Sequence, residues 1–189
     1  MGDEYKCFLS QLIPALVAYL KSKGVDKQCY FHISDEPNMD NFQRYNDCKS
    51  IVAPYLKGYN IIDALSHVEF YDTGVLEKPI PSLHRIQNFV DRGIKGLWAY
   101  YCGFGITVES QRFISQYLYK TRILGVQLYK YNVEGFLHWG FNFYHNQYSY
   151  DYVDPLGCTD AEGFAPAGDG FLVYPGNNGE VWGSLRLNA

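Results

Sequence analysis

The sequence predicts an α/β fold in which helices cover a largely parallel sheet. Short apolar runs rich in β-branched and aromatic residues alternate along the chain with longer segments whose apolar residues recur at helical spacing. Strands that alternate with helices in this way are typical of parallel sheets. With 189 residues, of which 47% are hydrophobic, the chain is long enough to bury the core of one domain.

The chain begins with a predicted helix, strand and helix. Residues 5–22 place apolar side chains at helical spacing, and Gly24 is expected to end that helix. The run "YFHIS" (30–34) predicts a short buried strand. A second helix is expected from Asp40, as its N-cap, to about Val52.

Two strands and a helix are predicted next. The runs "NIIDALS" (60–66) and "HVEFYDT" (67–73) predict two short strands, one after the other. The run "SLHRIQNFVDRG" (82–93) predicts a helix that Gly93 closes.

The second half of the chain is richer in aromatic residues. A strand is expected in "KGLWAYYCG" (95–103), then a long helix from Glu109 to about Tyr131, then a strand in "EGFLHWGFNFY" (134–144). Beyond it, glycine, proline, aspartate and asparagine are dense, which predicts loops and short irregular strands. We therefore divide one domain into a region of helices and strands (1–146), which we expect to carry the functional site, and a loop-rich C-terminal segment (147–189) of the same domain.

About five strands are predicted, which fits the later part of a TIM-like (β/α)8 barrel. In such barrels, sites lie at the carboxyl ends of the strands, on the loops that lead to the helices. A partial barrel would leave two exposed strand edges, through which two chains could associate.

Charge and composition exclude several classes of function. The net charge of −4, with no basic block, argues against a nucleic-acid surface. Aromatic residues make up 17% of the chain, which suits either a sugar-binding cleft or a tyrosine-rich core. No run of about 20 apolar residues predicts a membrane span.

The cysteines and the chain start carry little functional signal. Five cysteines without CxxC spacing predict neither a disulfide framework nor a zinc site, and we expect them to be reduced and mostly buried. No other metal or cofactor motif is visible. The sequence lacks a signal peptide, but its Met-Gly opening is typical of an added start, so localisation stays unknown.

The strongest candidate for chemistry is a pair of adjacent carboxylates, Asp35 and Glu36, at the end of a predicted strand. Side chains alternate faces within a strand, so both can face one site only where the chain already turns. Pro37 is expected to hold Glu36 in extended or polyproline geometry. Two adjacent carboxyl groups repel, which lets one be a proton donor while the other stays ionised. The alternative is an ordinary acidic turn between a strand and a helix.

Five motifs follow one another along the chain: "HISDEP" (32–37), "LWAYYCG" (97–103), "TRILGVQLYKYNVEGFLHWGFNFY" (121–144), "GDGFLVYPG" (168–176) and "SLRL" (184–187). They resemble, in this order, the motifs of glycoside hydrolase family 123, which overlaps the domain of unknown function numbered 4091. That resemblance covers most of the chain. It implies a (β/α)8 barrel with an exo-acting β-N-acetylgalactosaminidase site.

The resemblance also implies a mechanism and roles for the pair. In that family the 2-acetamido group of the sugar attacks the anomeric carbon and forms an oxazolinium intermediate, an exception to the usual pair of separated carboxyl groups. Carried onto this sequence, Glu36 would be the general acid and then the base. Asp35 would orient the acetamido group and stabilise its positive charge. Adjacent carboxylates agree with this mechanism, because they are too close together to flank a bond from opposite sides.

Further residues are candidates for glycan contact, each against a structural alternative. Aromatic rings can stack on a sugar or fill the core, and an asparagine can bond sugar hydroxyls as donor and acceptor. A histidine just before the pair can contact substrate or serve as a hydrogen-bonded residue of the barrel. These candidates are Trp98, Tyr100, Tyr101, Trp139, Asn142 and His32.

Other interpretations remain open. Compared with the family, the chain starts at the helix before the fourth strand, so we expect a truncated catalytic domain with weak or no activity of its own. A second enzymatic version pairs Glu36 with a distant carboxylate such as Asp72 or Glu69. The third is a non-catalytic carbohydrate-binding or structural remnant.

Overall fold

The computed structural model describes residues 2–103, 110–145, 150–157 and 166–188, and these form a mixed α/β structure. The chain divides into two compact units, Met1–Trp98 and Ala99–Ala189. The predicted division after residue 146 stays a prediction.

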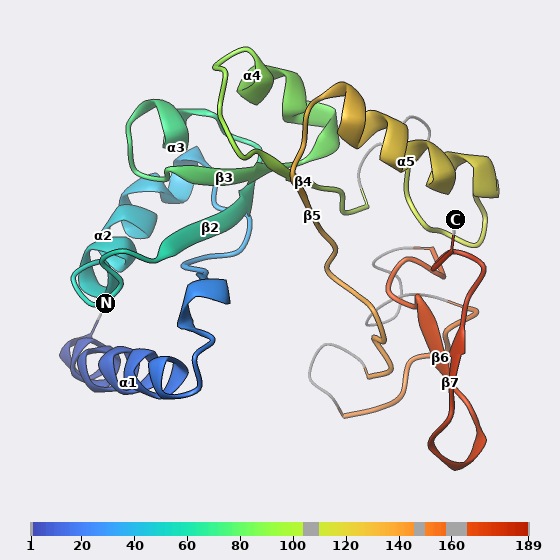
Figure 1. Cartoon of the computed structure of the whole chain (residues 1–189), viewed down its shortest axis with the longest axis horizontal. Helices are drawn as coiled ribbons and strands as arrows, with labels where there is room; N and C mark the ends of the chain where they lie inside the picture. Colours follow the sequence, from blue (N-terminus) through green and yellow to red (C-terminus); the bar gives the residue numbers. More distant parts are fainter. Residues whose placement is uncertain (1, 104–109, 146–149, 158–165, 189) are drawn as a thin grey trace. The chain divides into compact units, whose positions relative to one another are not determined.

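The first unit is built on a three-stranded parallel sheet (Figure 1). Its strands are β1 (Tyr30–Phe31), β2 (Asn60–Leu65) and β3 (Lys78–Pro81), in that spatial order. Both pairings are parallel, which confirms the predicted kind of sheet. Strand β1 is shorter than predicted, because its pairing with β2 stops at Phe31.

The sequence analysis missed β3 and misassigned the segment before it. Strand β3 contains Pro79 and Pro81, which lack the N–H that a central strand needs, but β3 lies at the edge of this sheet. The strand predicted over residues 67–73 is wrong, because the chain forms helix α3 (Glu69–Asp72) there. In so short a run, alternation of apolar and polar residues does not distinguish strand from helix.

Helices α1 (Asp3–Ser22) and α2 (Phe42–Val52) pack together over the sheet. Their common core contains Val17, Val52 and Leu56, and Phe31 and Ile33 pack against it from the first strand and the segment after it. Both helices were predicted, and α1 continues through its internal proline.

The entry to α2 differs from the prediction. Asp40 is not the cap, because the side chain of Asn38 accepts hydrogen bonds from the backbone of Asp40 (2.9 Å) and Asn41 (3.3 Å). Asn38 thereby starts a short 3-10 helix, η2 (Met39–Asn41), which leads into α2. The other helical turns of this unit are η1 (Asp26–Gln28), η3 (Leu83–Arg85) and α4 (Ile86–Val90).

The described part of the second unit contains one long helix and two small sheets. Strand β4 (Trp98–Tyr100), which starts at the last residue of the first unit, pairs with β5 (Gly135–Leu137), and β6 (Val173–Pro175) pairs antiparallel with β7 (Val181–Gly183). A 3-10 turn, η4 (Asn177–Gly179), joins β6 to β7. The described residues form no closed barrel.

Two predicted elements of this unit are shorter than expected. Helix α5 (Leu118–Lys130) starts well after Glu109, which lies outside the described residues. Strand β5 covers only the start of the predicted strand over 134–144. The short irregular strands predicted for the tail are confirmed by β6 and β7.

The cysteines that the structure describes are not buried as predicted. Cys7 is exposed, and Cys29, Cys48 and Cys102 are half-buried. Cys158 lies outside the described residues. Among the described helices, none combines the length and the apolar character that a membrane crossing requires.

Candidate functional site

Asp35 and Glu36 lie in a bend just after β1, and both are solvent-accessible. The prediction that the chain already turns there is confirmed. The extended geometry predicted for Glu36 is wrong, because its φ is 38°, in the left-handed region. The chain must turn from β1 into η2 within a few residues, and this outweighs the preference that Pro37 imposes. Such a conformation costs a non-glycine residue about 1–3 kcal/mol and is enriched at functional sites.

A buried carboxylate on the neighbouring strand holds the segment that carries the pair. Asp63 of β2 is inaccessible to solvent, with 0% of its surface exposed. Its Oδ1 atom accepts hydrogen bonds from the backbone nitrogens of Ile33 (2.9 Å) and Ser34 (3.1 Å). Asp63 therefore fixes the two residues immediately before the pair.

Two side chains complete the surroundings of Asp63. The Tyr45 hydroxyl of α2 donates to Oδ2 at 2.5 Å, and Nδ1 of His32 lies 2.5 Å from Oδ1. Burial, and then the charge of Asp63, raise the pKa of Tyr45 above its usual range, so this hydroxyl keeps the proton that it donates. The hydrogen bond to Asp63 is the main cause that raises the pKa of His32 above 6.5, with a smaller contribution from the charge of Asp35.

A cleft of about 590 Å³ lies beside this segment, within the first unit. Ser34, the residue before the pair, lines it, and Arg44 of α2 provides a cationic side chain. The other lining residues are Tyr5, Ile33, Asn41, Tyr45 and Cys48. The pair thus follows directly on a wall of this cleft.

The structure places the predicted aromatic residues of β4 differently from one another. Trp98 is half-buried and packs against Tyr30 of β1, with ring centroids 4.9 Å apart. Tyr100 and Tyr101 are buried, with 8% and 0% of their surface exposed, so in this arrangement a sugar ring reaches neither. Their contact with substrate stays an untested prediction.

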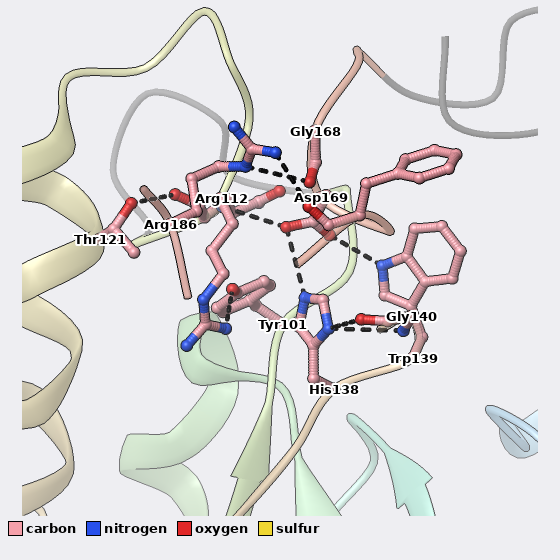
Figure 2. A network of polar contacts seen from close by, with 11 residues as sticks. Tyr101, Arg112, Thr121, His138, Trp139, Gly140, Gly168, Asp169 and Arg186 are labelled. Atoms are coloured by element: carbon pink, nitrogen blue, oxygen red, sulfur yellow. Dashed lines mark hydrogen bonds and ion pairs between the residues drawn. The ribbon is translucent and has the colours of Figure 1, made fainter. Parts of the chain in front are cut away.

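Trp139, in the second unit, is held by a buried carboxylate (Figure 2). Its indole Nε1 donates to Oδ2 of Asp169 at 2.8 Å, and Asp169 is only 1% exposed. The other carboxylate oxygen accepts the backbone N–H of Arg112 at 3.0 Å and lies 3.4 Å from Nε2 of His138. Asn142, the remaining candidate, is exposed and forms a β-bridge with Phe171.

Two arginines, Arg112 and Arg186, lie beside this network in Figure 2 and bind side-chain and backbone oxygens of neighbouring segments. The guanidinium of Arg112 donates to the Tyr101 hydroxyl at 2.6 Å and lies over the Tyr101 ring. Arg186 donates to the carbonyl oxygens of Gly168 (3.2 Å) and Phe171 (2.9 Å). Arg112 thereby ties together two segments that precede the tail, and Arg186 ties together two segments within it.

Glycines make this arrangement possible. A Cβ on Gly140 would lie 2.7 Å from the backbone Cα of Gly170, and one on Gly168 would lie 2.8 Å from the backbone nitrogen of Ile114. Gly168 also has a φ of +111°, which only glycine adopts readily. The glycines around Trp139 and Asp169 thus let three backbone segments approach closely.

Among the described residues, the sequence analysis missed two buried acids, Asp63 and Asp169. Each had a visible signal: Asp63 interrupts the apolar run "NIIDAL", and Asp169 stands between glycines in "GDG". An acid at a buried position requires several donors, which lie far away in the sequence. Among the described residues, no group of histidine, cysteine or acidic side chains could hold a metal ion.

Comparison with known proteins gives one family. The family model described as "Glycoside hydrolase 123, catalytic domain" matches residues 1–189, the whole chain. None of the curated proteins compared with this sequence matches it.

Proposed function

Because the chain belongs to the glycoside hydrolase 123 catalytic-domain family, and is thereby a glycoside hydrolase, we propose that it removes terminal β-linked N-acetylhexosamine. N-acetylgalactosamine is the preferred sugar in this proposal. The reaction retains the anomeric configuration, because the 2-acetamido oxygen of the substrate attacks first and water then attacks the oxazolinium from the opposite face.

One observation carries this proposal: Asp35 and Glu36 are adjacent, solvent-accessible, and placed just beyond the carboxyl end of a strand in a parallel sheet. Sites of α/β barrels lie at that end of the strands. Two adjacent residues are poorly suited to act on opposite faces of one glycosidic bond, which the ordinary mechanisms require. Substrate assistance needs only one proton donor and one group that holds the acetamide.

Each carboxyl group has one role in the proposed reaction. Glu36 donates a proton to the leaving oxygen, so that the glycosidic bond breaks as the acetamido oxygen bonds to the anomeric carbon. Asp35 accepts a hydrogen bond from the acetamido N–H and stabilises the positive charge of the oxazolinium. Glu36 then takes a proton from the attacking water, which regenerates the acetamido group and the acid.

The distant acids considered as partners of Glu36 are less suited to this role. Asp72 is bound by two nitrogens of Arg92, at 3.1 and 2.8 Å. That hydrogen bonding occupies both carboxylate oxygens and lowers the pKa of Asp72, so this carboxylate is a weak base and nucleophile. Glu69 is exposed on the same short helix, and its carboxylate lies 3.9 Å from His67.

We further propose that β1, β2 and β3 are consecutive strands of a (β/α)8 barrel. Their parallel pairing in sequence order, with helical segments between them, supports this. Within the first unit, Trp98 and His32 are the proposed contacts for the sugar; Trp139 and Asn142, in the second unit, stay predicted contacts. The two tryptophans would offer apolar faces, and the other two would offer hydrogen bonds.

The test is hydrolysis of an aryl 2-acetamido-2-deoxy-β-galactoside with a poor leaving group, by this chain and by two variants. Glu36→Gln should lower kcat about 100-fold or more, because it removes the proton donor. Asp35→Asn should also lower kcat, and should weaken binding of a thiazoline analogue of the oxazolinium. Asp91→Asn, an acid bonded to Gln87 on the surface, is the matched control.

The outcomes separate the mechanisms. Cleavage of matched sugars without the 2-acetamido group would rule out substrate assistance. Analogue binding without turnover, unaffected by either variant, would favour a carbohydrate-binding domain instead.

A further inference from the structure

We infer that Asp63 is a positioning residue for the Asp35–Glu36 pair, an inference that rests on the proposed function of that pair. Asp63 does not reach the substrate, because its side chain is wholly buried. It acts through the segment that it binds, residues 32–34, which leads directly into the pair.

The backbone of this segment depends on Asp63, because the sheet no longer holds it. The pairing of β1 with β2 ends at Phe31, opposite Ile61. Beyond Phe31, the backbone N–H groups of Ile33 and Ser34 donate to the Asp63 carboxylate rather than to the backbone of a neighbouring strand. The Asp63 side chain thus takes the place of the backbone hydrogen bonds of the sheet at the point where the chain leaves the sheet and bends.

The carboxylate is itself held from two sides, so the position that it imposes is well defined. Tyr45 of α2 donates to Oδ2, and His32 lies against Oδ1 together with the two backbone groups. Hydrogen bonds to a charged acceptor are stronger than neutral ones, and several on one carboxylate restrict its rotation. Ile33 also packs into the core formed with α1 and α2, so the segment has a second anchor.

This arrangement matters for catalysis because the pair lies only one and two residues further along. A general acid must lie within hydrogen-bond reach of the leaving oxygen, and small displacements cost large factors in rate. Glu36 also has a left-handed φ, a conformation that persists only when its surroundings impose it. Weakening the hydrogen bonds between Asp63 and this segment would therefore let the bend relax and move Glu36 and Asp35 away from the bond that breaks.

The test uses Asp63→Asn, which keeps the shape and removes the charge. Its amide oxygen can still face Ile33 and Ser34, and its NH₂ can face the Tyr45 hydroxyl, which can turn to accept. We expect the variant to fold, and kcat for the aryl N-acetylgalactosaminide to fall at least tenfold with a much smaller change in KM. Tyr45→Phe removes one donor to Asp63 but keeps the hydrogen bonds from the backbone of Ile33 and Ser34, so its loss of kcat should be smaller. Asp91→Asn is again the acid-to-amide control.

A double variant decides whether Asp63 acts through Glu36. On a Glu36→Gln background, Asp63→Asn should lower kcat by much less than it does on the parent chain. The glutamine amide cannot protonate the leaving oxygen, so moving it out of position lowers kcat little further. Full additivity of the two losses, or unchanged kcat for Asp63→Asn in a folded protein, would overturn the inference. If Glu36→Gln alone has no effect, the proposed function fails first, and this outcome is distinct.

Two measurements do not require turnover and therefore also test the inference if the chain has low activity. The amide proton resonances of Ile33 and Ser34 should lie downfield, as expected for N–H groups bound to a carboxylate, and should move upfield in Asp63→Asn. Affinity for the thiazoline analogue should fall in Asp63→Asn but not in Asp91→Asn. Unchanged resonances together with unchanged affinity would refute the positioning role.

Discussion

The indole nitrogen of Trp139 donates a hydrogen bond of 2.8 Å to Asp169, a carboxylate that is almost wholly buried thirty positions further along the chain. The same carboxylate binds the backbone N–H of Arg112, so three segments of the second unit meet at one side chain. The orientation of the half-buried Trp139 ring is thereby set by an acid that never reaches solvent.

Replacing Asp169 with alanine should destabilise the second unit. The change removes the carboxylate that accepts from the N–H groups of Trp139 and Arg112, and losing the acceptor of a buried donor costs about 1–3 kcal/mol. Asp169→Asn, which keeps one acceptor, should cost less. Denaturant unfolding followed by tryptophan emission measures both, and equal stability of Asp169→Ala and the parent chain would contradict the expectation.

His32 should make stability depend on pH in one direction. Its folded pKa lies above the ordinary value of 6.5, because Asp63 stabilises the charged ring. The contribution of the charged ring is therefore fully present below about pH 6.5 and is lost as the pH rises through the folded pKa. The difference in free energy of unfolding between the parent and His32→Asn should shrink over that interval. A difference that grows with pH would show that the sign is wrong.

Glu36→Asn should be more stable than Glu36→Gln, although both should be inactive. Asparagine tolerates left-handed φ values better than glutamine or glutamate, and the φ here is 38°. We expect a gain of up to about 1 kcal/mol in the free energy of unfolding, since the strain at such a residue is about 1–3 kcal/mol. Thermal and urea unfolding of the two amide variants measure it. Equal stabilities would mean that the bend relaxes once the carboxylate is gone.

Gly140→Ala should destabilise the protein by about 1–3 kcal/mol, as overpacking does. The added Cβ would lie 2.7 Å from the backbone of Gly170, which no side-chain rotation can relieve. Gly125→Ala is the control: Gly125 lies within α5 with nothing within 4 Å of an added Cβ, so it should gain up to about 1 kcal/mol from helix propensity. Urea unfolding of both variants should give opposite signs.

Much of the framework was predictable from local pattern. The helical spacing of residues 5–22 predicted α1, and the apolar run from Asn60 predicted β2, because both elements are long enough for their period to show. Strand β3 was not predicted, because its prolines are tolerated only at a sheet edge, and edge position is a property of the assembled sheet. The short helix α3 was mistaken for a strand, because one turn shows no period.

The candidate site was predictable only in part. The adjacency of Asp35 and Glu36, and their place where a strand ends, are written in the sequence, and so are the motifs that indicate the family. The burial of Tyr101, the donors that converge on Asp63, and the pairing of Trp139 with Asp169 join residues far apart along the chain. Covalent order and local propensity determine the first kind of feature. Only folding determines the second, because a buried carboxylate is stable where the tertiary structure brings enough donors to it.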